Sequence, residues 1–222
     1  PMGEHYYAHI GDLELKNVSF KYTDEGKTIL NNISLKVKKG EHIAIVGYNG
    51  AGKTTLIKLL MRLYDPTSGT ISYKNHNINE YNSADYRRLI GVVFQDFQMF
   101  GASLAENVVM DDISQDEFAQ HSHKIKSALI NSGFEEKLNK LENGLFTQVT
   151  TEFDKNGVDF SGGESQKVAI SRAFYKDAEI LIMDEPSSAL DPIAEYELNK
   201  AMETAAKGKT VFYISHRLST TR

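Results

Sequence analysis

A glycine-rich stretch after a short apolar run constrains the fold of this chain most strongly. Residues 47–55 read GYNGAGKTT, and residues 42–46, directly before them, read HIAIV. The apolar run is typical of a buried β-strand, and TTLIKLLMRLY, from Thr54 onward, has the composition and the apolar face of a helix. Strand, glycine loop and helix in this order form the context in which the pattern GxxxxGK[ST] has a physical meaning.

A loop of this kind binds phosphate groups. Gly47 and Gly52 let backbone N–H groups turn inward and approach an anion closely, and the following helix adds the positive end of its dipole. Lys53 supplies a formal charge for the outer phosphates, and the Thr54 hydroxyl can ligate Mg²⁺. We therefore predict a nucleoside triphosphate site; the alternative is a tight glycine turn with an incidental lysine.

Charge, cysteine content and hydropathy narrow the class of protein. The chain has 222 residues, a formal net charge of −5 and no cysteine. Thiolate catalysis, disulfides and thiolate metal sites are therefore excluded, and the acidic balance gives no reason to expect nucleic acid as a partner. No apolar run approaches the ~20 residues of a membrane-spanning helix. We expect one large domain, or one domain with an inserted subdomain.

Strand patterns alternate with helix patterns along the rest of the chain. LELKNVSFKY (13–22) and ILNNISLKV (29–37) alternate apolar and polar residues, which predicts antiparallel strands joined by a turn at DEGK. Further strands are predicted in TISYKN, RRLIGVVFQ, EILIMD and TVFYIS. SQDE at 114–117 is a candidate capping box, and helices are predicted after it, through EEKLNKL and after SGG. This alternation favours an α/β fold with a mainly parallel sheet and a helical insertion.

Two acidic residues end one of the predicted buried strands. Asp184 closes EILIMD, where its carboxylate can hold Mg²⁺ through water. Glu185 follows directly, and a carboxylate there can orient or deprotonate an attacking water. The alternative is a pair of acidic residues at a strand end without a catalytic role.

A second stretch of small residues, SGGE at 161–164, precedes a predicted helix. It repeats the arrangement of the first loop, with small residues, free N–H groups and a helix N-terminus. By itself this pattern is weak, and a helix C-cap or a plain loop is an equally good interpretation. Its position before Asp184 favours a second anion-binding site.

In their order, these stretches resemble the nucleotide-binding domain of ATP-binding cassette (ABC) transporters over nearly the whole chain. The matching motifs are Walker A in GYNGAGKT, the Q-loop in VVFQD, the signature in FSGGE (160–164), Walker B in ILIMD with Glu185, the D-loop in SALD (188–191) and the switch region in YISHR. The resemblance implies a P-loop NTPase core of RecA-like type with a mainly parallel sheet, an antiparallel β subdomain and an inserted α-helical subdomain. The implied domain spans 4–222, with the catalytic core at about 11–92 and 175–222 and the helical and signature subdomain at about 96–172.

The resemblance also implies a role for each site residue. Tyr22 would stack on adenine, Gln95 would contact Mg²⁺ or water, and His216 would sense the γ-phosphate; a core tyrosine, a polar loop residue and a surface histidine are the respective alternatives. The implied cofactors are ATP and Mg²⁺. The implied catalytic residues are Glu185, His216 and Gln95, and the implied Mg²⁺ ligands are Thr54, Gln95 and Asp184. The implied nucleotide-binding residues are Tyr22, Gly47, Asn49, Gly50, Gly52, Lys53, Thr54, Thr55, Ser161, Gly162, Gly163, Glu164 and Asp191.

Two further stretches resemble the exporter branch of the family, and three residues depart from its patterns. LYDPTSG matches the segment after the Walker A helix, and TEFDKNG (151–157) resembles a loop that touches the coupling helices of a membrane domain, with Glu152 as its key acid. In that loop Asp154 replaces a glycine and Asn156 replaces an arginine. Glu164 replaces the usual glutamine of the signature. A carboxylate about 10 Å from a phosphate charge costs roughly 0.4–1.7 kcal/mol, so we expect weakened closure at most.

The resemblance implies partners and a location as well. Two such domains pair head to tail, so a second copy is expected, in a homodimer or a heterodimer. A transmembrane domain is expected to be fused upstream, which places this otherwise soluble domain at the cytoplasmic face of a membrane, expected to be the bacterial plasma membrane. The C-terminal part is expected to be truncated after His216. The alternatives are a soluble ABC ATPase acting on nucleic acid or ribosomes, a small-molecule P-loop kinase and a binding-only regulatory cassette.

Overall fold

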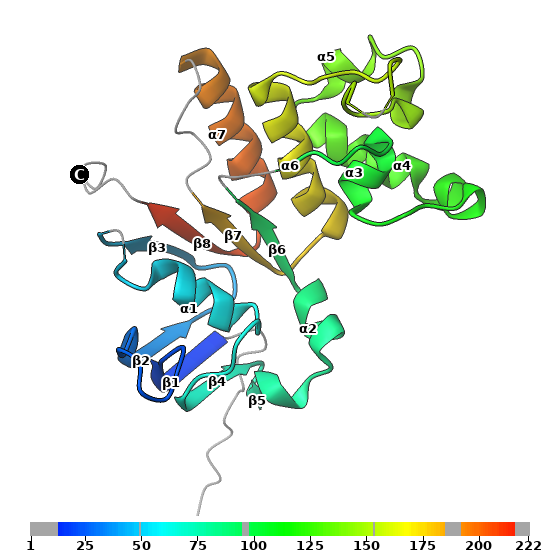
Figure 1. The fold of residues 1–222 in the computed structure, drawn as a ribbon. Helices are drawn as coiled ribbons and strands as arrows, with labels where there is room; N and C mark the ends of the chain where they lie inside the picture. The colour runs from blue at the N-terminus through cyan, green and yellow to red at the C-terminus, as the bar shows by residue number, and fades with distance from the viewer. Residues whose placement is uncertain (1–12, 49, 95–97, 153, 185–191, 216–222) are drawn as a thin grey trace, which may run out of the picture. The chain divides into compact units, whose positions relative to one another are not determined.

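The structure of the protein is a computed structural model that describes residues 13–48, 50–94, 98–152, 154–184 and 192–215 (Figure 1). These residues form two compact units. The first unit runs up to Ile90 and resumes at Gly208, and the second unit spans Gly91–Lys207. The second unit includes residues 175–207, so the predicted assignment of this segment to the catalytic core stays a prediction.

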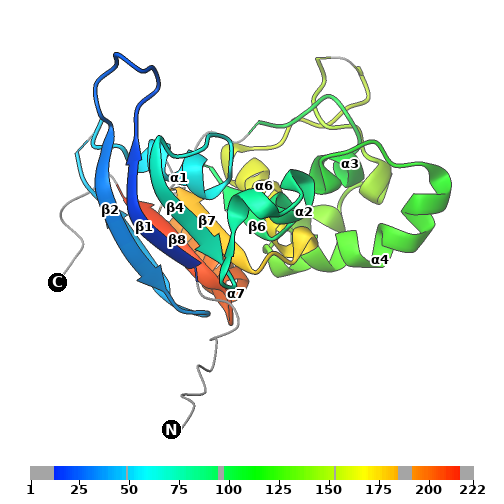
Figure 2. The same cartoon turned by 90° about the horizontal axis from the view of Figure 1, so that it is seen from below.

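The first unit contains an antiparallel sheet in the order β2-β1-β4-β5, and Figure 2 shows its three longer strands side by side. The strands are β1 (Leu13–Phe20), β2 (Leu30–Val37), β4 (Ser68–Tyr73) and β5 (His76–Asn77). The predicted antiparallel pairing of β1 with β2 is confirmed. Strand β1 buries Leu13 and Leu15, then Val18 and Phe20. The alternation of buried and exposed residues changes phase at Asn17, which has a φ of 50°. The pairing register between β1 and β2 shifts at the same place, as in a β-bulge.

A parallel pair completes the strands of the first unit. Strand β3 (His42–Val46) pairs with β8 (Thr210–Ser215) in register from His42↔Val211 to Val46↔Ser215. The prediction of a buried strand at 42–46 is wrong, because β3 alternates between half-buried and exposed residues. Strand β8 is its one hydrogen-bonded neighbour among the described strands, and a strand at the end of a sheet keeps more of its surface exposed.

The helices of the first unit follow the strands that position the predicted loop. Helix α1 (Lys53–Leu60) begins seven residues after the end of β3 and buries Ile57, Leu59 and Leu60. A 3₁₀ turn, η1 (Ile78–Glu80), and the short helix α2 (Ser83–Arg88) come later in the chain. The hydroxyl of the fully buried Tyr86 donates to Leu60 O at 2.9 Å, which ties α2 to the end of α1.

The second unit combines two strands with the main helices. Strands β6 (Ile90–Val93) and β7 (Ile180–Asp184) are neighbours in a sheet. A Cβ on Gly91 would lie 2.9 Å from Leu181 Cδ2, so this position requires glycine for close packing. Helix α6 (Gly162–Lys176) contacts α3, α4 and α7 (Pro192–Ala206), as Figure 1 shows. The buried strand predicted in EILIMD is confirmed by β7.

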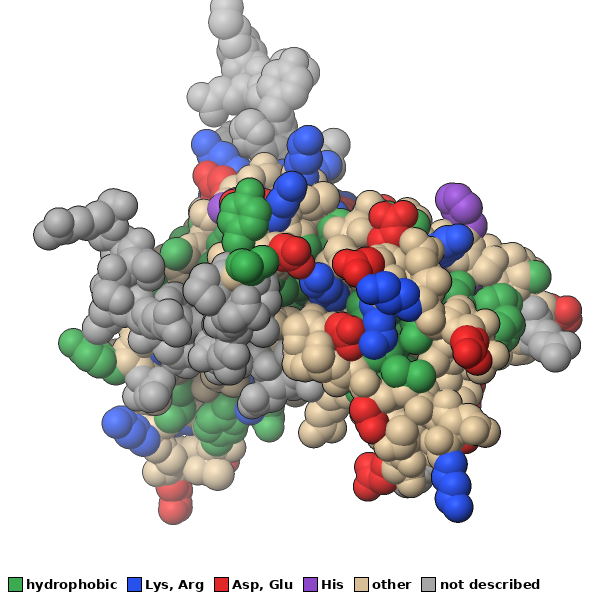
Figure 3. All heavy atoms as spheres, turned by 90° about the horizontal axis from the view of Figure 1, so that it is seen from above, with side chains coloured by type: hydrophobic (Ala, Val, Ile, Leu, Met, Phe, Trp, Pro, Cys, Tyr) green, Lys and Arg blue, Asp and Glu red, His purple; other side chains and the backbone are tan. Residues whose placement is uncertain are grey.

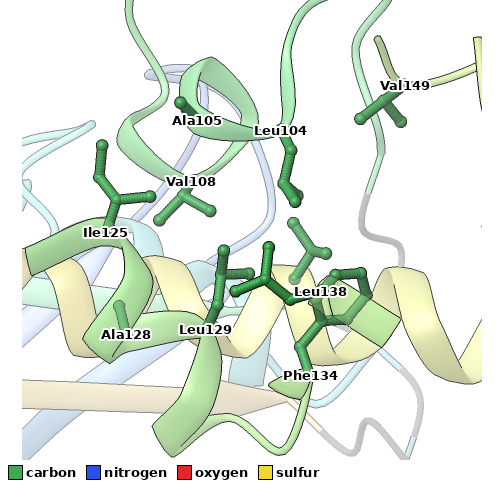
Figure 4. Packing of buried hydrophobic residues seen from close by; sticks show 10 residues of the cluster. Leu104, Ala105, Val108, Ile125, Ala128, Leu129, Phe134, Leu138 and Val149 are labelled. Carbon is green, nitrogen blue, oxygen red and sulfur yellow. The ribbon is translucent and has the colours of Figure 1, made fainter. Parts of the chain in front are cut away.

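An apolar cluster holds the helices of the second unit together (Figure 4). It is built by α3 (Leu104–Val109), α4 (Gln115–Asn131), α5 (Glu135–Leu138) and α6, with the 3₁₀ turn η2 (Gly144–Phe146) nearby. Its buried members are Leu104, Ala105, Val108, Ile125, Ala128, Leu129, Phe134, Leu138, Val149 and Val168. Apart from Val149, these side chains converge from separate helices or their ends, so burial rather than local propensity stabilises the short α3 and α5.

Capping boxes begin three of these helices. The predicted box at Ser114 and Glu117 is confirmed at the start of α4. Ser103 with Glu106 forms a second box at α3, and Ser161 with Glu164 a third at α6. In each box, the serine hydroxyl accepts a hydrogen bond from the backbone amide of the glutamate, and the glutamate carboxylate accepts one from the backbone amide of the serine.

One half-buried arginine fixes α6 to α3 and to the chain before it. The guanidinium of Arg172 donates from Nε to Asn107 O at 2.8 Å and from Nη2 to Gln98 O at 2.9 Å. Burial lowers the pKa of Arg172 to about 10. Two neutral carbonyl acceptors therefore hold this cation, and its removal would leave the carbonyl of the buried Asn107 without this donor.

Candidate functional site

The glycine loop delivers the bare N-terminus of α1. Gly52 is the N-cap of α1, with a φ of 93°, and a Cβ there would lie 2.9 Å from Leu30 Cδ2 and 3.1 Å from Ile29 O. The first turn of α1 contains no acidic residue, and its N-cap makes no side-chain hydrogen bond. Helices α3, α4 and α6 are capped by their own serines, whereas the first amides of α1 are left for another acceptor. An anion is the partner that the dipole of α1 favours.

Lys53 places a buried ammonium beside this helix end. The residue is 6% exposed, and its Nζ donates to the carbonyl oxygens of Gly47 and Tyr48. These are its hydrogen-bond acceptors in the described part of the chain, and both are uncharged. A buried cation without a countercharge is costly. The site therefore fits an anion such as a phosphate chain, with Lys53 already held against the loop.

A cavity of about 340 Å³ opens beside the loop within the first unit. The Tyr22 hydroxyl and Thr55 Oγ1 lie 3.1 Å apart, so a hydrogen bond links the predicted base-stacking residue to the first turn of α1. Thr55 is buried and Thr54 is exposed. The structure thus brings together predicted residues from the segment after β1, the glycine loop and α1. The cavity is lined by Tyr22, Ile29, Gly50, Gly52, Lys53, Thr54 and Thr55.

Two residues that the sequence reasoning missed support Tyr22. The Tyr64 ring meets the Tyr22 ring edge to face at 5.4 Å between centroids, and Lys58 Nζ lies 5.8 Å from the centre of the Tyr22 ring. Phe20 contacts Tyr22 from the strand at 4.9 Å. Lys58 lies one helical turn after Thr54 on α1. This i,i+4 spacing is the sequence signal that could have identified Lys58 as a neighbour of the site.

The N-terminus of α6 forms a second candidate anion site, in the second unit. The capping box uses the amides of Ser161 and Glu164. It leaves the amides of Gly162 and Gly163 without a hydrogen-bond acceptor among the described residues, at the N1 and N2 positions of α6. Gly162 is exposed, and a Cβ there would meet nothing within 4 Å. The end of α6 is therefore open to a ligand.

Glu164 stands where the signature motif usually has glutamine, and each of its two carboxylate oxygens has a partner. Its Oε2 accepts the Ser161 amide at 2.9 Å, and its Oε1 lies 3.1 Å from Lys137 Nζ. The Lys137 side chain comes from α5 and also lies 5.8 Å from the centre of the Phe160 ring. The negative charge of Glu164 is therefore paired within the second unit.

Oxygen donors for a metal are present at both predicted positions that the structure describes. The exposed Thr54 offers its hydroxyl from α1, and the half-buried Asp184 offers its carboxylate from the end of β7. Hydroxyl and carboxylate oxygens are the donors that Mg²⁺ prefers, so each of these residues, taken in its own unit, has the chemistry of a ligand of that ion. Of the other predicted site residues, Asn49, Gln95, Glu185, Asp191 and His216 lie outside the described residues.

In the loop at 151–157, the two residues that depart from the family pattern, Asp154 and Asn156, form a local turn. The carboxylate of Asp154 accepts the Asn156 amide at 2.9 Å, and the Asp154 carbonyl accepts the Gly157 amide at 2.8 Å. Asp154 thus forms an Asx-type turn where the family pattern has glycine. Thr151 donates its hydroxyl to Asp159 at 2.6 Å, which lowers the pKa of Asp159. Glu152 is exposed beside this turn.

Comparisons with known proteins agree with this geometry. The profile of the family described as ABC transporter matches residues 30–188. The ATP-dependent lipid A-core flippase of Ralstonia nicotianae is 40% identical over 220 residues, which are 98% of this chain and 36% of the flippase. ATP-binding cassette sub-family B member 5 of Homo sapiens is 37% identical over 215 residues, which are 96% of this chain and 16% of that protein.

A solved structure of a bacterial Atm1-family ABC exporter with ATP bound matches with a TM-score of 0.78 and 32% identity, covering 96% of this chain and 36% of that chain. The chain thus spans about a third of the length of the flippase and of this exporter. None of the helices in the described ranges combines the length and the apolarity that a bilayer crossing needs. The predicted P-loop NTPase fold, with parallel and antiparallel sheets, is confirmed. The chain belongs to the ABC transporter family, in which it corresponds to the nucleotide-binding domain of the exporters.

Proposed function

We propose that this chain is the ATP-hydrolysing motor of a membrane exporter. One observation carries the proposal: within the described ranges, the buried ammonium of Lys53 has only uncharged acceptors, and it lies at the uncapped end of α1, beside a cavity edged by Tyr22. A triphosphate would supply the missing negative charge, and the Tyr22 ring offers an aromatic surface for the base. Family membership supports ATP as the nucleotide.

The residues of the first unit would bind and orient ATP. The amides of the loop from Gly47 to Gly52, with Asn49 and Gly50 inside it, and the first turn of α1 would hold the phosphates, with Thr55 near the α-phosphate. Thr54, Gln95 and Asp184 would hold Mg²⁺, which, when bound, neutralises charge on the β- and γ-phosphate oxygens. Hard oxygen donors at these positions support that assignment.

The acidic end of β7 would supply the proton chemistry. Glu185 would accept a proton from the attacking water as general base, and His216 would hold that water beside the γ-phosphate. The displaced phosphate leaves as the bond between the β-oxygen and the γ-phosphorus breaks. Asp191 and Gln95 would report the state of the site to the partner domains.

A second copy of the domain would complete the site. We infer that Ser161, Gly162, Gly163 and Glu164 of one copy close over ATP bound by the other. The free glycine amides at the end of α6 support this role. Closure excludes water and aligns the reacting groups. Relatives about three times as long support a fused transmembrane domain and a position at the cytoplasmic face of a membrane.

Phosphate release by the purified protein tests this function. Wild-type protein with Mg²⁺ and ATP is expected to release phosphate, and Glu185→Gln is expected to lose on the order of 10²–10⁴ in turnover while it still binds ATP. Lys53→Met should lose ATP binding as well. Unchanged turnover in Glu185→Gln, or ATP binding that does not depend on Lys53, would contradict the proposal.

A further inference from the structure

Glu164 poses a specific problem for the end of α6. It is an anion at the N3 position of the helix whose first amides, on Gly162 and Gly163, would bind phosphate under the proposed function. A carboxylate is itself a favoured ligand of such amides. An unrestrained Glu164 side chain would therefore compete with the triphosphate for the same donors.

Lys137 restrains this carboxylate from outside the helix. The 3.1 Å ion pair occupies Oε1, and the Ser161 amide occupies Oε2, so both oxygens have partners other than Gly162 and Gly163. The side chains of Lys137 and Glu164 are each 28% exposed. This pair is therefore less screened by solvent than an ordinary surface pair.

The position of Lys137 is fixed by packing. Helix α5 is anchored on both sides of Lys137 by Phe134 and Leu138, two buried members of the apolar cluster. Phe134 meets Phe160, the residue before the capping box, edge to face at 5.2 Å. Lys137 Nζ lies over that same Phe160 ring. The ammonium is thus held next to the start of α6 before any ligand binds.

We propose that Lys137 is a positioning residue that holds the Glu164 carboxylate off the amides of Gly162 and Gly163 and so keeps the end of α6 open to ATP. The inference rests on the proposed function and extends it to a residue outside the motifs. It explains how this chain uses glutamate where the family pattern has glutamine, because a neutral side chain needs no such restraint.

A neighbouring lysine provides a matched control. A cavity of about 550 Å³ in the second unit is lined by Lys137 and Glu164, and also by Lys140 with Glu136 and Lys167 with Glu197. Lys140 pairs with Glu136 at 2.6 Å and Lys167 with Glu197 at 2.7 Å. Figure 3 shows acidic and basic side chains interspersed over the face seen from above. Lys140→Met therefore removes the same charge from the same cavity while it leaves the direct ion pair between Lys137 and Glu164 in place.

The test is a double-mutant cycle between Lys137→Met and Glu164→Gln, read as the ATP concentration that gives half-maximal phosphate release. Lys137→Met should raise that concentration roughly threefold to tenfold when Glu164 is present. In the Glu164→Gln background, Lys137→Met should raise the half-maximal ATP concentration no more than Lys140→Met does. Lys137→Arg should restore the wild-type value, and melting temperatures should verify that each variant is folded. Lys137→Gln repeats the test if Lys137→Met fails to fold.

Two results would overturn the inference. One is an equal rise for Lys137→Met with Glu164 and with Gln at that position, which would mean that Lys137 acts through its charge at a distance. The other is an effect of Lys137→Met no greater than that of Lys140→Met with Glu164 present. Absence of ATP turnover in the wild-type protein would instead overturn the proposed function, and this inference with it.

Discussion

The phenol oxygen of Tyr22 lies 3.1 Å from Thr55 Oγ1, so a strand-end aromatic residue is tied directly to the first turn of the phosphate-loop helix. The Tyr22 ring is 47% exposed, while Thr55 is 6% exposed. The buried hydroxyl of Thr55 therefore fixes the tip of an aromatic ring that is otherwise open to the cavity. This arrangement allows the contribution of the ring to be separated from that of its hydroxyl.

We predict that Tyr22→Ala weakens ATP binding by roughly 1–3 kcal/mol, the usual contribution of one base–aromatic stack. Tyr22→Phe keeps the ring and loses only the link to Thr55, so its Kd should lie within a few-fold of wild type. Isothermal titration of ATP measures both values. Equal losses in the two variants would show that the ring does not stack on the base.

We predict that Gly52→Ala destabilises the first unit by about 2–4 kcal/mol, because a Cβ adds left-handed backbone strain and a clash with Leu30 and with the Ile29 carbonyl. Gly40→Ala is the matched control. Gly40 has a similar φ of 83°, but a Cβ there meets nothing within 4 Å, so its cost should be about 1 kcal/mol. Urea unfolding measures both, and equal costs would contradict the role assigned to packing around Gly52.

We predict that Ser103→Ala destabilises the second unit by about 1 kcal/mol at neutral pH, the usual cost of an N-cap. The Ser103 hydroxyl donates to Glu106 at 2.6 Å and lowers the pKa of Glu106 below its ordinary 4.5. A lowered folded pKa means that this stabilisation is complete above the unfolded value and is lost as the pH falls through the folded value.

The difference between wild type and Ser103→Ala should therefore shrink as the pH falls below 4.5. Thermal unfolding followed across this pH range measures it. Ser103→Thr keeps the hydroxyl and should resemble wild type throughout. A difference that stays constant with pH would show that the capping box does not act through the charged form of Glu106.

The sequence predicted the elements whose signals are local. Alternating residues predicted β1 and β2, and Ser114 with Glu117 predicted the start of α4. The same Ser-x-x-Glu pattern at 103–106 and 161–164 was not read as a capping box, although the signal is identical. Helix α7 was also missed; Leu198, Ala201, Met202 and Ala205 are buried at helical spacing, and Pro192 at its start is a typical signal.

Other features depend on tertiary packing and could not be predicted. Lys137 and Glu164 are far apart in the sequence, and their pairing depends on how Phe134 and Phe160 pack. The exposure of β3 follows from its position at the end of a sheet, which an apolar run does not reveal. The cost assigned to Glu164 from its charge alone also left out this partner.

The central claim is that the end of α1 in one copy and the end of α6 in another bind the same ATP. The chain contains no cysteine, so single cysteines report contacts without background. Tyr48 is 77% exposed on the phosphate loop, and Asp159 is exposed two residues before Ser161. Differently sized versions of Tyr48→Cys and Asp159→Cys protein, mixed and treated with a bismaleimide of about 10 Å, can form a mixed crosslink only between copies. We predict this mixed crosslink with Mg²⁺ and ATP and little of it without nucleotide; no mixed crosslink, or one that is independent of ATP, would contradict the account.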